Sequence, residues 1–178
     1  LARSSIATAG ADIFWGDERW VPLDSEESNA GVALRTFLTK VPLLPEHLHP
    51  IYDPELDEAQ GAAIYQALIE EIVAPVDGVP AFDLIFLGMG DDGHTASLFP
   101  GTEVIHETQK LVAAPWVEKF KSYRITLTPP TLNAARQITF MIRGEDKAEA
   151  LQAVRRGLLD PDRYPAQMSG GQQQRVAL

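Results

Sequence analysis

Residues 82–101 read FDLIFLGMGDDGHTASLFPG, and the interpretation of the whole chain starts from this stretch. The first six residues are mostly apolar, as in a β-strand that is covered on both faces. Gly88, Gly90 and Gly93 follow, and they predict a tight turn that brings backbone N–H groups close to a ligand oxygen. In α/β folds ligands bind beyond the carboxyl ends of the strands, so we expect a binding site at this turn.

Further strands are indicated by short runs rich in aliphatic and aromatic residues, at 11–15, 111–114, 124–127 and 137–142. Helices are expected at residues 29–38, 145–156 and after Asp57, which is a suitable N-cap. In the helix after Asp57 the apolar residues recur at helical spacing and predict a buried stripe of Ile64, Leu68 and Ile72, with Ala63 and Ala67 beside it. Four prolines between residues 42 and 54 indicate a loop. The pattern predicts an α/β fold of three layers, α/β/α and Rossmann-like, with a mainly parallel sheet.

Composition narrows the function classes. The 178 residues are enough for one domain and carry a net charge of −10, which disfavours a nucleic-acid partner. The chain has no cysteine, so disulfides, thiolate catalysis and cysteine-ligated metals are excluded. We see no long apolar run and no signal segment, and we therefore expect a cytoplasmic protein that does not enter a membrane.

His94 is the candidate general base, because imidazole has the side-chain pKa nearest neutrality and the residue lies in the glycine turn. Asp92 or Asp91 would orient its ring. The alternative is a hydrogen-bonded structural histidine. The spacing of Gly88 and Gly93 also imitates a nucleotide phosphate loop, but the lysine of that loop is absent and the two aspartates would repel phosphates.

Charged residues follow the predicted strand 11–15, where Asp17, Glu18 and Arg19 supply two carboxylates and a guanidinium. Arg19 offers a planar donor fork that matches phosphate or carboxylate oxygens, although a solvated turn with an Asp–Arg pair is the alternative. Lys147 falls in the first turn of the predicted helix 145–156, where the helix dipole attracts anions. His47 and His49 are expected at the surface, and we predict no metal and no cofactor.

Five segments resemble the 6-phosphogluconolactonase family in order, between about residues 11 and 167. They read FWGDERWVP (14–22), SN (28–29), GMGDDGHTASLFPG (88–101), RITLT (124–128) and GEDKA (144–148). The resemblance implies metal-free hydrolysis of 6-phospho-D-glucono-1,5-lactone to 6-phosphogluconate in the pentose phosphate pathway. It makes His94 the base, and Arg19 and Lys147 contacts of the substrate phosphate. Asp17, Gly88, Gly90 and Gly93 complete the implied substrate site, and we expect a monomer or weak dimer.

Two alternatives to the lactonase stay open. The related glucosamine-6-phosphate deaminases share the Gly-His pair, but residues 97–100, SLFP, favour the lactonase. A non-catalytic remnant that binds sugar phosphates is the other. Family members carry a first βα unit with a phosphate loop ahead of the matched segment, and we expect this chain to lack it, to be poorly active and to aggregate.

The last residues differ from the family pattern. Residues 164–178 end in MSGGQQQRVAL, which is similar to the signature segment of ABC transporter ATPases. That signature caps a nucleotide held by another subunit's phosphate loop, and this chain offers no Walker lysine of its own. We therefore divide the chain into a lactonase-like domain at 1–167 and an atypical tail at 168–178, and we expect a chimeric junction near residues 164–167.

Overall fold

The computed structural model describes residues 10–144 and residue 147. The helices are α1 (Asn29–Thr36), α2 (Glu58–Ile72) and α3 (Pro129–Ala134), and short 3₁₀ turns lie at Leu38–Lys40, Pro45–His47, Glu103–His106 and Glu118–Phe120. The strands are β1 (Ile13–Phe14), β2 (Asp17–Arg19), β3 (Leu48–His49), β4 (Pro75–Val76), β5 (Val79–Pro80), β6 (Ile85–Leu87), β7 (Val112–Ala113), β8 (Trp116–Val117), β9 (Ser122–Leu127) and β10 (Ile138–Phe140). Each predicted strand overlaps an observed one, and the α/β class is confirmed.

The strand pairing is mixed. In the described part of the chain β1 pairs with β3 and β6 pairs with β10 in parallel. β9 runs antiparallel to β2, β7 and β8, and β4 and β5 form a small antiparallel ribbon. The expectation of a mainly parallel sheet is therefore wrong for these residues, because β9 joins three neighbours by antiparallel pairing. The three-layer arrangement stays a prediction.

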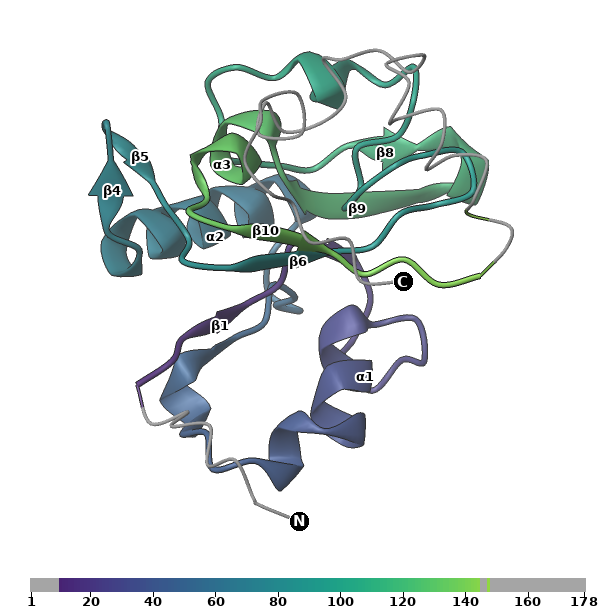
Figure 1. Cartoon of the computed structure of the whole chain (residues 1–178). Coiled ribbons are helices and arrows are strands. Elements are labelled where there is room, and N and C mark those ends of the chain that lie inside the picture. The colour runs from purple at the N-terminus through teal and green to yellow at the C-terminus, as the bar shows by residue number, and fades with distance from the viewer. Residues whose placement is uncertain (1–9, 145–146, 148–178) are drawn as a thin grey trace.

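In Figure 1, β6 and β10 cross the middle of the molecule, with α2, α3 and β9 on one side and β1 and α1 on the other. Ile69, Ile125, Leu132 and Phe140 are at most 2% exposed and form the centre of the apolar core between these elements. β1 and β6 are not paired with each other, although Phe14 contacts Phe82 ahead of β6 with ring centroids 5.3 Å apart.

Both longer helices begin at residues that satisfy their free N–H groups. Ser28 is the N-cap of α1, and its hydroxyl accepts from the Gly31 N–H at 2.9 Å. Asp57 caps α2 as predicted, in a capping box in which its carboxylate accepts from the Gln60 N–H and the Gln60 side chain accepts from the Asp57 N–H.

The predicted buried face of α2 is wrong. Ile64 is 54% exposed and Ile72 is 38% exposed, whereas the buried residues of the helix are Gly61, Ala62, Tyr65 and Ile69. Tyr65 fixes this orientation, because its hydroxyl accepts from the Trp15 N–H at 2.7 Å and donates to the Trp15 carbonyl at 3.2 Å. The Trp20 ring occupies the space beside Gly61 where a side chain would stand. Contacts with Trp15 and Trp20, which are distant in sequence, thus decide which face of α2 is buried, and the apolar spacing does not.

The loop expected between residues 42 and 54 contains a strand, β3, which the prolines obscured. His49 in β3 was expected at the surface, but this prediction is wrong, because the residue is buried and only 9% exposed. It stacks on Phe14 at 4.4 Å, and its Nε2 lies 2.8 Å from Asp12 Oδ1, which also bonds Nδ1 of His47. The imidazoles therefore help to hold β1 against β3.

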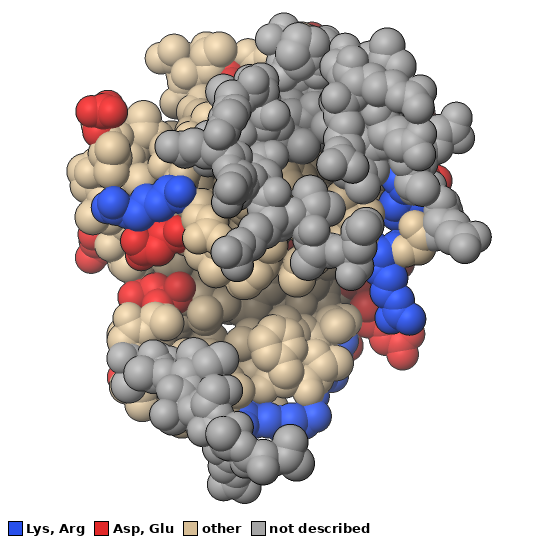
Figure 2. Space-filling model, in the orientation of Figure 1, with Lys and Arg blue, Asp and Glu red and all other residues tan. Residues whose placement is uncertain are grey.

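Two predicted segments fall outside the described residues: the helix 145–156, apart from Lys147, and the tail 168–178. The division of the chain at residue 167 stays a prediction. Within the described residues no helix is long and apolar enough to cross a membrane. On the face seen in Figure 2, the coloured basic and acidic side chains are scattered among uncharged ones rather than gathered into a basic patch.

Candidate functional site

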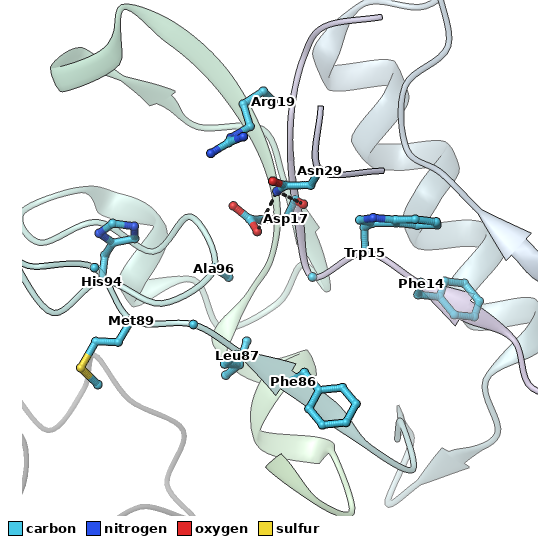
Figure 3. A pocket seen from close by; sticks show the side chains of 13 residues that line it. Phe14, Trp15, Asp17, Arg19, Asn29, Phe86, Leu87, Met89, His94 and Ala96 are labelled. Carbon is cyan, nitrogen blue, oxygen red and sulfur yellow. Dashed lines mark hydrogen bonds between the residues drawn. The ribbon is translucent and has the colours of Figure 1, made fainter. Parts of the chain in front are cut away.

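A cavity of about 470 Å³ lies beside β2, where β1 and β6 end. Five of the predicted site residues line it: Asp17, Arg19, Gly88, Gly90 and His94. Figure 3 shows Arg19 and Asp17 extending from β2 toward the space that His94 faces from the glycine turn. The structure thus brings together two segments that are about seventy residues apart, as expected for the carboxyl ends of strands.

The glycine turn folds back on itself after β6. The Gly90 N–H donates to the His94 carbonyl at 2.8 Å, and the Gly93 N–H donates to the Gly90 carbonyl at 3.1 Å. Gly93 has a φ of +82°, in the left-handed region that favours glycine. These two N–H groups are engaged inside the turn, so they are not the donors that we expected to face a ligand.

His94 and Asp92 form a hydrogen-bonded pair at the edge of the cavity. Nδ1 of His94 lies 2.6 Å from Asp92 Oδ1, and Oδ2 of Asp92 accepts from Lys119 Nζ at 3.2 Å. Partial burial raises the pKa of Asp92, but the hydrogen bonds from His94, the charge of His94 and the bond from Lys119 outweigh it and lower the pKa to about 2. Asp92 is therefore an ionised acceptor, so Nδ1 of His94 carries the proton that it donates. Nε2 is left to accept one whenever the ring is neutral.

Two close neighbours pack against the imidazole ring. Its centroid lies 4.2 Å from that of Phe99. The ring also lies close to the backbone of Gly90, where a β-carbon would lie 2.1 Å from His94 Nδ1. Glycine at position 90 therefore makes room for the imidazole, a role that the sequence pattern did not reveal.

The three charged residues of β2 have different surroundings. Glu18 is fully buried, and its carboxylate accepts from the N–H groups of Asn29 at 2.7 Å and Ala30 at 2.8 Å at the start of α1. The alternative interpretation of this segment as a solvated turn is thus wrong, because residues 17–19 form a strand whose middle residue, Glu18, is buried. Asp17 and Arg19, on the opposite face of the strand, line the cavity.

Asn29 and Ser97 support Asp17, and neither was assigned a role from the sequence. The Asn29 side chain donates to the Asp17 carbonyl at 3.0 Å and lines the cavity. The Ser97 hydroxyl donates to Asp17 Oδ2 at 2.7 Å, so the loop after His94 is tied to β2. In the sequence Asn29 was marked by its place at the start of the predicted helix 29–38 and in the family-like pair SN (28–29).

The remaining predicted site residues lie outside the cavity lining. Asp92 reaches it through His94, and Gly93 shapes the turn. The Lys147 N–H donates to the Gly144 carbonyl at 3.3 Å, and its role toward a substrate stays a prediction. Among the residues that the structure describes, no cluster of three or more His, Cys, Asp or Glu side chains is arranged to hold a metal ion.

The lowered pKa of Asp92 predicts a loss of stability in acid. A carboxyl group whose pKa is lower in the folded protein stabilises it above the unfolded pKa of 3.8, and this contribution disappears as the pH falls from there through about 2. Asp92→Asn should therefore flatten the fall in unfolding free energy over this range, as measured by urea denaturation. Asp91→Asn, which removes the neighbouring exposed carboxylate, is the matched control; equal slopes for the two variants would contradict the prediction.

Residues 1–178 match the family model for glucosamine-6-phosphate isomerases and 6-phosphogluconolactonases. The chain belongs to this family. It is 37% identical to the 6-phosphogluconolactonase of Synechocystis sp. over 93% of its length, and 37% identical to that of Nostoc sp. over 86%. A crystal structure of 6-phosphogluconolactonase from Thermotoga maritima superposes with a TM-score of 0.73 at 31% identity, over 93% of the chain.

The chain spans about two thirds of these family members: 69% of the Synechocystis protein, 64% of the Nostoc protein and 70% of the Thermotoga chain. The resemblance read from the glycine turn and the segment around Arg19 is thus confirmed at the level of the family.

Proposed function

We propose that the protein hydrolyses 6-phospho-D-glucono-1,5-lactone to 6-phosphogluconate, a step of the pentose phosphate pathway. The observation that carries the proposal is the 2.6 Å bond between Asp92 and Nδ1 of His94, on a cavity that Arg19 also lines. A base for water and a cation for a phosphate are two of the groups that this reaction needs. The relatives named above are 6-phosphogluconolactonases, which supports the same reaction.

His94 would act on water through Nε2. As the water oxygen bonds to the lactone carbonyl carbon, Nε2 takes the water proton and the ring becomes an imidazolium stabilised by Asp92. The tetrahedral intermediate collapses with cleavage of the ring C–O bond, and the imidazolium returns the proton to the departing alkoxide. Asp92 acts through the imidazole and is a positioning residue, while His94 touches the reacting atoms.

Binding of the phosphate would place the lactone ring against the base. Arg19 contributes a guanidinium to the cavity, and Lys147 is proposed as a second contact. Gly88, which has open space where a β-carbon would stand, leaves room for the ring of the sugar. We further propose that the protein is a monomer or weak dimer in the cytoplasm and binds no nucleic acid, in keeping with its net charge of −10.

The direct test is a comparison of two reactions with the purified chain. Freshly prepared 6-phosphoglucono-1,5-lactone should be opened faster than its spontaneous hydrolysis, whereas glucosamine 6-phosphate should release no ammonia. The reverse result would assign the chain to the deaminase branch of the family. If neither substrate reacted, calorimetry with 6-phosphogluconate would still separate a binding remnant, which gives heat, from an inert one.

Gly90→Ala tests the packing of the base. The added methyl group would overlap the His94 ring, which must move away from Asp92, and we expect kcat for the lactone to fall by about 10²-fold. Gly88→Ala should raise KM instead, because its methyl group meets no protein atom within 4 Å and projects into open space. Steady-state kinetics of both variants checks this, and an unchanged kcat for Gly90→Ala would refute the role of the close contact.

A further inference from the structure

Arg124 lies beside Arg19 in the sheet that forms one wall of the site. β9 pairs with β2 so that Arg124 is opposite Arg19 and Thr126 is opposite Asp17. Alternate residues of paired strands share a face, so these four side chains are on the same side of the sheet. The loop that follows His94 contacts that side, because the Ser97 N–H donates to Thr126 Oγ1 at 3.1 Å and its hydroxyl donates to Asp17.

The Arg124 side chain is buried and makes no ion pair with the residues that the structure describes. The residue is 8% exposed, and its Nε is buried with no hydrogen-bond partner. Among the described residues no carboxylate lies within ion-pair distance of either Arg124 or Arg19. Burial, and then the charge of Arg19, lower the pKa of Arg124, and the charges of the Asp17, Glu27 and Glu18 carboxylates offset this only in part. Holding two guanidinium groups together in this way costs stability, and the fold of the described residues does not offset that cost with an ion pair.

A row of aromatic rings connects Arg124 to the base. The guanidinium carbon of Arg124 lies 5.0 Å from the centroid of Phe120, and Phe120 packs edge-on against Phe99 at 5.6 Å. Phe99 in turn contacts the His94 ring. Arg124 thus neighbours Arg19 across the strand pair and contacts the aromatic rings that pack against His94, and its planar group lies over a ring rather than against an acid.

We propose that Arg124 and Arg19 together form an anion site that binds the phosphate group of the substrate. A phosphate dianion would neutralise both guanidinium groups, and it could accept from the fork-shaped donors of each. The inference rests on the proposed lactone hydrolysis, since it names the phosphate of that substrate. It assigns to β9 a binding residue in addition to those of β2 and the glycine turn.

The test is binding of 6-phosphogluconate to the wild-type chain, to Arg124→Met and to Arg136→Met, measured by calorimetry. Arg136→Met is the control. It removes the same charge from an exposed side chain just before β10 that pairs with Asp83, and this variant should bind 6-phosphogluconate as the wild type does. Arg124→Met should bind about 10- to 100-fold more weakly, the range for losing hydrogen bonds between charged groups. Its melting temperature without ligand should be equal or higher, because an unpaired buried charge has been removed.

That combination separates a binding role from a structural one, which would lower the melting temperature and leave the affinity unchanged. If Arg124→Met does not fold, Arg124→Gln replaces it, with the same expected loss of affinity. Binding within about twofold of the wild type for the folded variant would overturn the proposal, as would a wild-type chain that gives no heat. A wild type that binds 6-phosphogluconate but opens no lactone would overturn the proposed reaction alone, and the calorimetric comparison would still decide the role of Arg124.

Discussion

His94→Ala is expected to lower kcat for 6-phosphoglucono-1,5-lactone by about 10²- to 10⁴-fold, the usual contribution of a positioned general base. The ring lies against the cavity with Nδ1 committed to Asp92, so its removal takes away the acceptor for the proton of water. The proposed phosphate contacts are untouched by this change, so the affinity for 6-phosphogluconate should change little. Rates corrected for spontaneous hydrolysis, together with calorimetry, provide the measurement.

His106→Ala is the matched control for this variant. His106 is exposed in the 3₁₀ turn Glu103–His106, and its replacement should leave both kcat and affinity unaltered. If purified His94→Ala turned over at the wild-type rate, the assignment of the base would fail. If it lost binding as well as turnover, the imidazole would be holding the ligand rather than moving a proton.

The largest effect on stability is expected for Glu18→Ala. The fully buried carboxylate accepts four hydrogen bonds, from the N–H groups of Arg19, Asn29 and Ala30 and from the Ser28 hydroxyl. Without it, donors at the start of α1 are left unsatisfied away from water. We expect the free energy of unfolding to fall by about 3–5 kcal/mol, as for other losses of a buried charged partner.

Urea denaturation measures this change, and Glu26→Ala serves as the control because Glu26 is an exposed carboxylate in the same loop. Glu18→Gln should lose less than Glu18→Ala, since one amide oxygen can still accept while the amide nitrogen meets donors. A Glu18→Ala variant as stable as Glu26→Ala would show that solvent replaces the carboxylate at the start of α1.

The parts of the fold that could be predicted are those whose signal is local. The apolar run before Gly88 and the capping residue Asp57 act within a few positions of the elements they specify, and both predictions are confirmed. β2 was missed because its residues Asp17–Arg19 are all charged, and their strand conformation depends on pairing with β9, more than a hundred residues later. The periodicity of a short segment does not show which distant strand it pairs with, so β2 could not be predicted in this way.

The site follows the same division. His94 was identifiable from its residue type and its glycine neighbours, and the structure places it on the cavity with Arg19. The buried position of Glu18 and the unpaired charge of Arg124 depend on α1 and β9, which approach β2 only in the folded chain. From the sequence alone, Glu18, which accepts hydrogen bonds at the start of α1, could not be told from Asp17, which lines the cavity.

The bond between the Ser97 hydroxyl and Asp17 spans the two halves of the site. One half carries the Arg19 guanidinium, which would bind the phosphate at one end of the ligand. The other carries the His94 imidazole, which would act at the lactone ring. Because this bond joins the two halves, the distance between the guanidinium and the imidazole is set before a ligand binds. The protein would then select among lactones by the number of carbons between phosphate and carbonyl, and shorter homologues would be held out of reach of the base.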